Sequence, residues 1–251
     1  MDRSFASKLK MRLKGDWKNL YFSPRETVEH PFGEMVGELL RFPEEYDWAR
    51  YYVFAGDPIA GAIPPEEADK LCAQAVQCGK KRAQALRRQF PDKSVREICQ
   101  AMGVRVEEDL SDASGAQVRF AEFVEPELIR INPECVKRAE ERCAQLEAEN
   151  PLPEQTPGDV LMAHELYHFL ESKEPELFTA AYRHKTGRAA LFGPARVITL
   201  GEIGAGAFAK ELAQLKTPAY VYDVIFTYCF HSAQAGRLYE RIKAGLTRKG
   251  N

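Results

Sequence analysis

The chain has 251 residues, 45% of them hydrophobic and 29% charged, with a formal net charge of −2 at pH 7. A chain of this length buries a substantial core, and its near-neutral charge gives no bulk attraction to nucleic acid, so we expect no direct nucleic-acid binding. No apolar run is long enough to cross a bilayer, and the basic N-terminus lacks the apolar core of a secretory signal. We therefore expect no membrane association and a cytoplasmic location.

Six cysteines are scattered along the chain without a Cys-x-x-Cys pair: Cys72, Cys78, Cys99, Cys135, Cys143 and Cys229. In a chain without a secretory signal, this pattern is typical of reduced thiols rather than of disulfides or a zinc knuckle.

Residues 1–65 are rich in aromatic side chains and interrupted by prolines, which predicts an irregular N-terminal extension. We expect its rings to pack on the main body of the protein, which we assign to residues 66–251. The alternative is an arm that docks a partner or a substrate, including nucleic acid stacked on the rings.

The next segment predicts helices followed by short strands. Apolar residues at three- and four-residue spacing predict a helix over 64–90, and Ser94 with Glu97 forms a capping box for a second helix over 94–103. Alternating residues predict strands at 104–106, 116–123 and 128–132, and the last two are close enough to form a hairpin. Asn132-Pro133 then begins a helix to about residue 149. The fold class is therefore α+β, mainly helical with a small, mostly antiparallel sheet.

A His-Glu-x-x-His motif follows a proline-rich loop over 150–158. Thr156-Pro157 marks the start of a helix that is apolar nearly all round, and His164 and His168 lie four residues apart on it. Two imidazoles at that spacing both reach one Zn²⁺ ion. Glu165 is rotated away from the histidines, at the position of a general base that accepts a proton from zinc-activated water.

The chain after this motif offers the third zinc ligand. A polar segment over 174–190 predicts a helix, and a helix rich in small residues follows over 198–212. Small side chains let two helices approach closely, so a carboxylate in its first turns can reach the same ion. We assign Glu202 as the third ligand and expect Glu211, further along, to be solvated. A last helix is predicted from Thr217-Pro218 to about Leu246.

The two segments together resemble the ImmA/IrrE-type zinc metallopeptidases, which are zincins of the gluzincin-like kind. The resemblance rests on His164-Glu165-Leu166-Tyr167-His168 and on the run from Glu202 to Leu212, which is similar to the family's Glu-x-x-Ala-Asn-x-Phe-Ala-x-x-Leu helix. It covers roughly residues 66–215. It implies a zincin-like fold, ligands at His164, His168 and Glu202, Glu165 as the base, and a bacterial or phage endopeptidase whose substrate is often a helix-turn-helix transcriptional repressor.

The chain departs from this family at two positions. Tyr167 replaces a glycine between the ligand histidines, and Gly206 replaces an asparagine that can hydrogen-bond a ligand imidazole. Loss of such a bond typically lowers metal affinity or activity about 10–100-fold. Asp223, Tyr182 and Glu171 are the candidates to replace it.

The expected reaction is hydrolysis of a peptide bond. The substrate would add as a strand beside Leu128-Ile129-Arg130-Ile131-Asn132. An oxyanion donor would assist the zinc, and the candidates for this role are Tyr167, Tyr182, His184 and His231. The alternative function is a catalytically weak or inactive interaction module in which zinc only holds two helices together. A fourth protein ligand or a plugged groove would favour that module.

Overall fold

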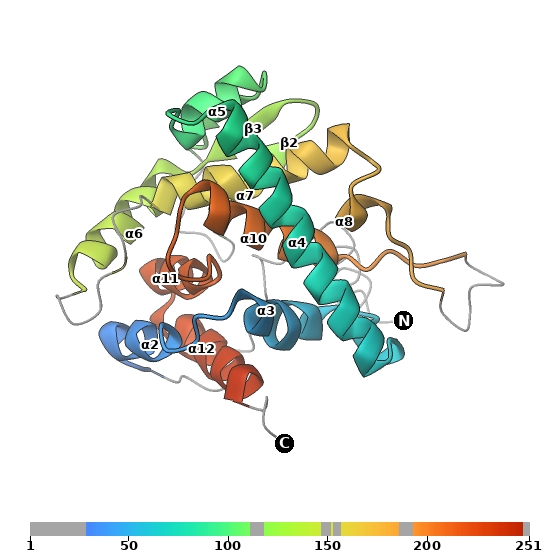
Figure 1. Cartoon of the computed structure of the whole chain (residues 1–251). Helices are drawn as coiled ribbons and strands as arrows, with labels where there is room; N and C mark the ends of the chain where they lie inside the picture. Colours follow the sequence, from blue (N-terminus) through green and yellow to red (C-terminus); the bar gives the residue numbers. More distant parts are fainter. Residues whose placement is uncertain (1–28, 111–117, 147–151, 153–156, 186–192, 248–251) are drawn as a thin grey trace, which may run out of the picture.

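The computed structural model of the chain describes residues 29–110, 118–146, 152, 157–185 and 193–247 (Figure 1). The long helix α4 (Pro65–Gln89) crosses α10 (Thr199–Leu212), and α10 also packs against α7 (Pro157–Lys173). A three-stranded sheet lies beside α7, at one end of the helical body. The α+β class predicted from the sequence is therefore confirmed, and the body is mainly helical.

The helices before the sheet follow the sequence signals closely. α4 begins at Pro65, with Glu66 and Glu67 in its first turn and arginines in its last, as the charge pattern of a helix dipole favours. In α5 (Val95–Ala101), the Ser94 side chain accepts a hydrogen bond from the Glu97 N–H, and the Glu97 carboxylate accepts one from the Ser94 N–H. Both predicted helices and the predicted capping box are confirmed.

The sheet is mixed, which corrects the prediction of a mostly antiparallel sheet. Its strands are β1 (Arg105–Glu108), β2 (Ala121–Val124) and β3 (Leu128–Ile131), in the order β1-β3-β2. β2 and β3 form the predicted antiparallel hairpin, whereas β1 pairs in parallel with the other edge of β3. Alternation along such short strands specifies which side chains face the core but not the direction of the neighbouring strand.

The next helix begins where the sequence predicts. In α6 (Pro133–Ala144), the side chain of Asn132 accepts hydrogen bonds from the N–H groups of Glu134 and Cys135, which satisfies the free donors of the first turn. Residues 147–149, predicted as its last turn, lie outside the described residues. The same holds for most of the predicted loop 150–158 and for its Thr156 cap, and α7 begins at Pro157.

Within the described residues, the segment after α7 is helical only over α8 (Phe178–Ala181), so the helix predicted for 174–190 is wrong at 174–177 and 182–185. The backbone leaves the helical region at Tyr182, with ψ of 137°, and His184 then pairs with Ala195 through two backbone hydrogen bonds. This pairing satisfies the backbone groups that a longer helix would have bonded internally. Residues 186–192 lie outside the described part.

The C-terminal segment forms two helices, α11 (Val221–Phe230) and α12 (Ser232–Thr247), rather than the single predicted one. The break is at His231, where φ is −148° and ψ is 81°. The two helices pack on each other, and both contribute buried side chains to the main core, including Val224, Ile225, Leu238 and Ile242. Folding back buries two apolar faces that one straight helix would leave unpaired.

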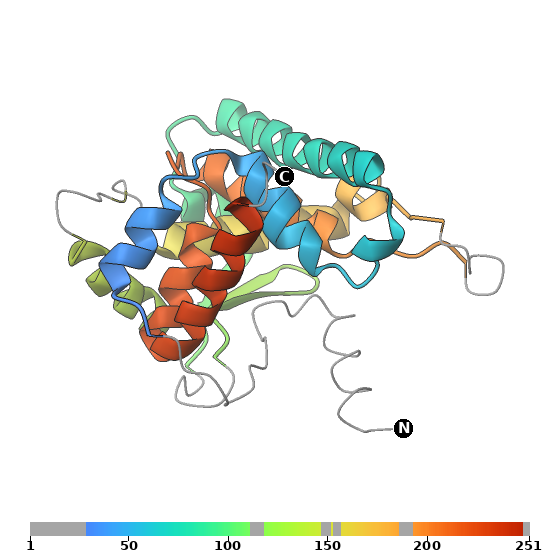
Figure 2. The ribbon, with the colours of Figure 1, turned by 90° about the horizontal axis from the view of Figure 1, so that it is seen from below.

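The described part of the N-terminal segment is a series of short helices: α2 (Phe32–Leu39), α3 (Glu45–Trp48), the π-helical η1 (Ala49–Val53), and the 3₁₀ turns η2 (Phe54–Gly56) and η3 (Ala60–Ala62). Figure 2 shows α2 alongside α12. Trp48 is fully buried in the large core around α7 and the sheet, whereas Phe54 is buried in a second core between α4 and α10. These two rings are integral to the packing.

None of the helices in the described part of the chain has the length and apolarity needed to span a membrane. All six cysteines are free thiols.

Candidate metal centre

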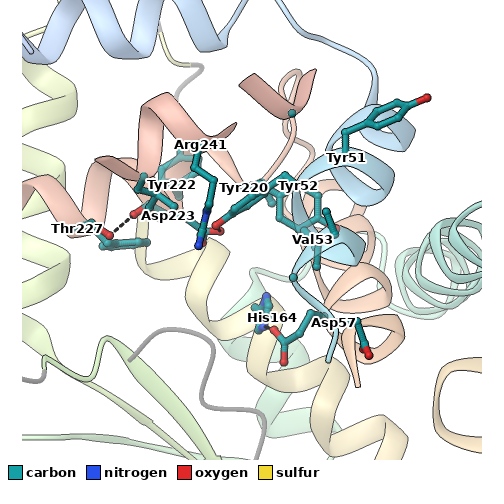
Figure 3. Close-up of a pocket in the computed structure, with 18 of the residues that line it drawn as sticks. Tyr51, Tyr52, Val53, Asp57, His164, Tyr220, Tyr222, Asp223, Thr227 and Arg241 are labelled. Carbon is teal, nitrogen blue, oxygen red and sulfur yellow. Dashed lines mark hydrogen bonds and ion pairs between the residues drawn. The ribbon is translucent and has the colours of Figure 1, made fainter. Parts of the chain in front are cut away.

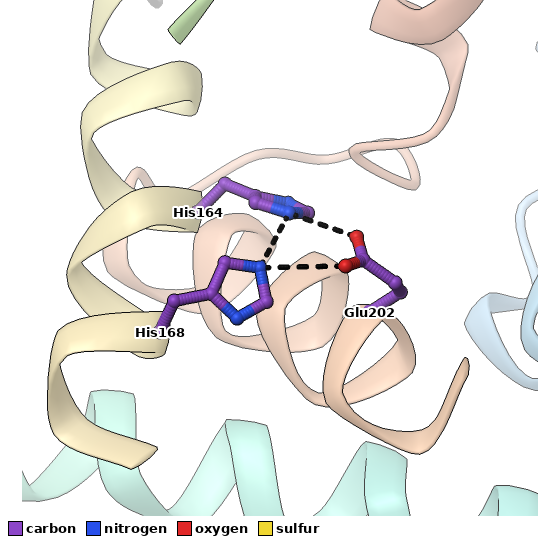
Figure 4. Close-up of side chains that lie close together, drawn as sticks. All are labelled: His164, His168 and Glu202. Atoms are coloured by element: carbon purple, nitrogen blue, oxygen red, sulfur yellow. Dashed lines mark hydrogen bonds and ion pairs between the residues drawn. The ribbon is translucent and has the colours of Figure 1, made fainter. Parts of the chain in front are cut away.

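Helices α7 and α10 bring three potential metal ligands together (Figure 4). His164 and His168 are one turn apart on α7, and their Nε2 atoms are 3.2 Å from each other. Glu202, in the first turn of α10, points its carboxylate at both rings. Its Oε2 lies 3.2 Å from His164 Nε2, and its Oε1 lies 3.6 Å from His168 Nε2. The predicted trio is therefore assembled in space.

These separations suit a tetrahedral metal ion. Zinc binds imidazole nitrogen and carboxylate oxygen at about 2.0–2.2 Å, which places two ligand atoms of a tetrahedron about 3.3–3.5 Å apart. The three observed separations, 3.2, 3.2 and 3.6 Å, bracket that value. Within the described residues, this is the one group of three or more His, Cys, Asp or Glu side chains that meets the distance requirement for a shared ion.

The charges around the trio also favour a cation. Three carboxylates, from Glu165, Glu171 and Glu202, lie near the two imidazoles, and those of Glu165 and Glu171 are buried. Burial alone would lower the pKa of His168. The charge of Glu202, the hydrogen bond with Glu171 and the charge of Glu165 outweigh burial and raise that pKa to about 9. The carboxylates thus favour a positive charge at this place, either a protonated imidazole or a bound cation.

Glu171 fixes the orientation of one ligand. Its Oε2 is 3.1 Å from His168 Nδ1, the ring nitrogen that faces away from the other ligands. Burial raises the pKa of Glu171, but the hydrogen bond and the charge of His168 lower it by more, so it lies below the ordinary value and the acid is ionised. Glu171 was one of three candidates to replace the family's asparagine, and it does contact a ligand imidazole.

Glycines allow α10 to lie close to its neighbours. A β-carbon at Gly79 of α4 would stand 2.1 Å from the carbonyl oxygen of Gly204, so the two backbones are in direct contact. A β-carbon at Gly201 would stand 3.0 Å from the nearest carboxylate oxygen of Glu171. The small residues that predicted a close helix pair therefore do bring Glu202 to the histidines.

The two departures from the family motif are accommodated by neighbouring side chains. Tyr167 is fully buried, and its ring occupies the space beside Gly204, where a β-carbon would stand 2.5 Å from its hydroxyl. Gly206 faces Tyr220 in the same way, at 2.4 Å, and the Tyr220 hydroxyl donates to the carbonyl of Ile203. The space that an asparagine would occupy is therefore filled by a phenol.

Glu165 points toward the sheet. Its Oε2 accepts a hydrogen bond of 2.9 Å from the backbone N–H of Phe123 in β2, and its side chain is 6% exposed. Phe123 pairs with Ile129 of β3, and this N–H points away from β3 toward α7. The proposed base thus joins the metal helix to the free edge of the sheet.

The prediction that a substrate strand adds beside residues 128–132 is wrong, because β3 is not an edge strand. β3 is the central strand, paired with β1 on one side and β2 on the other, so its backbone groups are already bonded and no further strand can add there. This applies to the whole predicted stretch Leu128, Ile129, Arg130, Ile131 and Asn132. The free edge nearest the metal centre belongs to β2, which the sequence pattern alone did not single out.

The four predicted oxyanion donors lie elsewhere. The Tyr167 hydroxyl bonds Thr179 and Cys78 in the interior. Tyr182 and His184 both bond the Glu67 carboxylate at the start of α4. His231 lies at the break between α11 and α12. Among the described residues, none of these four belongs to the metal trio or lines the cavity beside it.

Asp57 is a site residue that sequence reasoning missed. Its Oδ2 accepts hydrogen bonds of 3.0 Å from both the N–H and the hydroxyl of Thr199, so it caps the helix that carries Glu202. The Asp57-Pro58 step resembles an ordinary turn, and its partner is 142 residues away. No local signal in the sequence predicts such a long-range cap.

A cavity of about 660 Å³ opens beside the trio (Figure 3). His164 and Glu202 line it at one end, and the N-terminal segment, α11 and α12 line most of the rest, together with Phe120 and further residues of α7 and α10. A neighbouring cavity of this size is within the range of pockets that hold small organic ligands.

No protein-family model, curated protein or solved structure matches this chain.

Proposed function

We propose that this protein is a zinc-dependent peptidase of the ImmA/IrrE type, working in the cytoplasm on a protein or peptide substrate such as a transcriptional repressor. The observation that carries the proposal is the spacing of the His164, His168 and Glu202 ligand atoms, which fits one tetrahedral ion. Three protein ligands leave the fourth corner of a tetrahedron for water, as catalytic rather than structural zinc requires.

Each residue has a distinct role in this proposal. His164, His168 and Glu202 would hold the ion, and Glu171 would orient His168 through its Nδ1 atom. A zinc ion held there would supply Lewis-acid activation of water near neutral pH. Glu165 would accept a proton from the attacking water and pass it to the leaving amine. Its buried carboxylate, next to two imidazoles, supports this role.

The substrate would lie along the free edge of β2. This edge is the one next to α7, and its Phe123 N–H already donates to Glu165, so a bound peptide would pair with the rest of the edge. An extended peptide added to a sheet edge gains backbone hydrogen bonds that do not depend on its sequence.

One observation favours the second candidate function, a zinc-stabilised interaction module. The bond from Phe123 to Glu165 gives the acid a structural task, because it links the metal helix to the sheet. In the module, the acid would keep this bond and no peptide would be cleaved.

The experiment compares wild type with Glu165→Gln and, as a control away from the metal trio and from the β2 edge, Glu134→Gln in α6, where the acid forms an exposed ion pair with Arg138. Zinc content is measured by mass spectrometry of the native protein, and cleavage is measured on a mixed peptide library. We expect Glu165→Gln to keep one zinc and to lose about 10²–10⁴-fold in cleavage rate, while Glu134→Gln stays near wild type. Undiminished cleavage by Glu165→Gln would contradict the assigned base. Zinc without any cleavage by wild type would support the module.

A further inference from the structure

The cavity beside the metal centre is lined in part by the motif-bearing helices α7 and α10 and largely by parts of the chain outside the motifs. Its walls come from residues 51–58 in the N-terminal segment, from the C-terminal helices α11 and α12, and from α7, α10 and Phe120 (Figure 3). The motifs themselves contribute only His164, Glu202 and Gly206 to the lining. We propose that this cavity is the specificity pocket of the peptidase and that it receives a bulky aromatic side chain adjoining the scissile bond. This inference rests on the proposed function.

The walls are apolar and aromatic. The buried apolar and aromatic side chains that line the cavity are Phe120, Val160, Leu161, Ala219, Tyr220, Tyr222, Phe226 and Leu238. Phe120 and Phe226 stack with ring centroids 5.2 Å apart, and Tyr52 meets Tyr220 edge to face at 6.3 Å. A further ring entering this space gains both apolar burial and aromatic contacts.

Several polar groups of the lining are paired, whereas the buried Tyr222 hydroxyl has no hydrogen-bond partner among the described residues. The Tyr52 hydroxyl donates to Asp223 Oδ2 at 3.0 Å, and the Arg241 guanidinium lies over the Tyr52 ring, 5.6 Å from its centroid. Asp57 is held by the start of α10. One acid and one base stand together at the α11–α12 end, so the cavity has no strong preference for a charged ligand there. A neutral aromatic group fits this balance better than an acidic or a basic one.

The cavity adjoins the metal trio. His164 and Glu202 form part of its wall and also two-thirds of the metal trio. A substrate side chain that enters the cavity would therefore belong to a residue whose backbone lies next to the metal trio. The pocket would select which peptide bond is presented, while the β2 edge would hold the backbone without regard to sequence.

The test uses a matched pair of threonines. Thr227 lines the cavity and its hydroxyl donates to the carbonyl of Asp223, one turn earlier, at 2.6 Å. Thr247 makes the same bond to Lys243 at 2.7 Å but is exposed and outside the lining. Thr227→Phe fills part of the cavity, and Thr247→Phe places the same ring on the surface. Ala244→Phe, at an exposed lining position, is a second filling variant in case Thr227→Phe fails to fold.

Blocked peptides Ala-Ala-X-Ala-Ala, with X as Phe, Leu or Ala, are the probes. Their binding to the metal-free protein and to zinc-loaded Glu165→Gln is measured by calorimetry, and their cleavage by wild type is measured separately. We expect the Phe peptide to bind at least about tenfold more tightly than the Ala peptide. The filling variants should reduce that preference to about threefold or less, and Thr247→Phe should leave it unchanged.

The outcomes separate the two proposals. Equal binding of all three peptides, or a Phe preference that survives both filling variants, overturns the pocket assignment. Zinc-dependent cleavage without any preference for X leaves the peptidase proposal standing and removes the pocket. A Phe preference that depends on Thr227, found in a protein that cleaves nothing, keeps the pocket and removes the peptidase.

Discussion

The ring of Tyr167 fills the space that a side chain at position 204 would need. A β-carbon at Gly204 would stand 2.5 Å from the Tyr167 hydroxyl and 2.7 Å from two carbons of the ring. The hydroxyl is held by Thr179 at 2.8 Å, and the side chain is fully buried. The bulky residue within the metal motif is therefore matched to a glycine on the facing helix.

We predict that Gly204→Ala destabilises the fold by about 1–3 kcal/mol. The added methyl group forces the Tyr167 ring to move in a packed interior, and this cost exceeds the gain of about 1 kcal/mol in helix propensity. The measurement is the free energy of unfolding in urea. Gly61→Ala is the control, because no atom lies within 4 Å of its added β-carbon. Equal stability of the two variants would refute the tight contact.

A second prediction concerns the orientation of His168. Replacing Glu171 by Gln removes the charged partner of the Nδ1 atom, so we expect zinc affinity to fall about 10–100-fold with little change in helical content. Competition with a chromogenic chelator measures the affinity. The control is Glu174→Gln, three residues after Glu171. It breaks an ion pair with Arg82 and should leave zinc binding unchanged. A similar loss in both variants would show that His168 does not depend on Glu171.

The sequence predicts the metal trio because its evidence is local. A His-Glu-x-x-His helix places His164 and His168 by helical periodicity. A run of small residues predicts a second helix that packs closely against it and carries Glu202. It does not predict which strand is the edge, because the parallel β1–β3 pairing depends on a connection across the sheet. The break at His231 has no proline or glycine to mark it. The cavity walls come from both ends of the chain and become visible only in the folded structure.

The raised pKa of His168 predicts how the metal-free protein responds to pH. This pKa is about 9 in the fold, above the ordinary value of 6.5, so the protonated imidazole stabilises the metal-free fold below pH 6.5. This contribution of His168 to the stability of the metal-free fold declines as the pH rises and is lost above about pH 9. We expect the Tm of the metal-free protein to fall between about pH 6.5 and pH 9, and His168→Gln to weaken that dependence. A wild-type Tm that rises over this range would contradict it.

Zinc binding should show the opposite trend. The ion needs a neutral imidazole, so binding near neutral pH must release the proton of His168. We expect affinity to increase up to about tenfold per pH unit until the pKa of about 9 is reached. Calorimetry in two buffers of different ionisation enthalpy counts the released protons, and we expect about one near pH 7.5. No proton release would mean that His168 is neutral before the metal arrives.

The last prediction concerns the link between Asp57 and Thr199. Asp57 is 6% exposed and accepts two hydrogen bonds from Thr199, which is three residues before Glu202. The helix start that carries the third ligand is therefore fixed by a residue from the N-terminal segment. A cap of this kind is typically worth about 0.5–2 kcal/mol.

Asp57→Ala should therefore lower both stability and zinc affinity, whereas Asp57→Asn, which keeps an oxygen acceptor, should retain most of each. Asp69→Ala is the matched control, because this acid forms a partly exposed ion pair with Arg50 away from the metal trio. Unfolding in urea gives the stability, and chelator competition gives the affinity. If Asp57→Ala loses stability but binds zinc as tightly as wild type, the cap supports the fold without positioning Glu202. If Asp69→Ala loses zinc affinity to the same degree, the effect belongs to general destabilisation, because Asp57 is the one of these two acids that is hydrogen-bonded to Thr199.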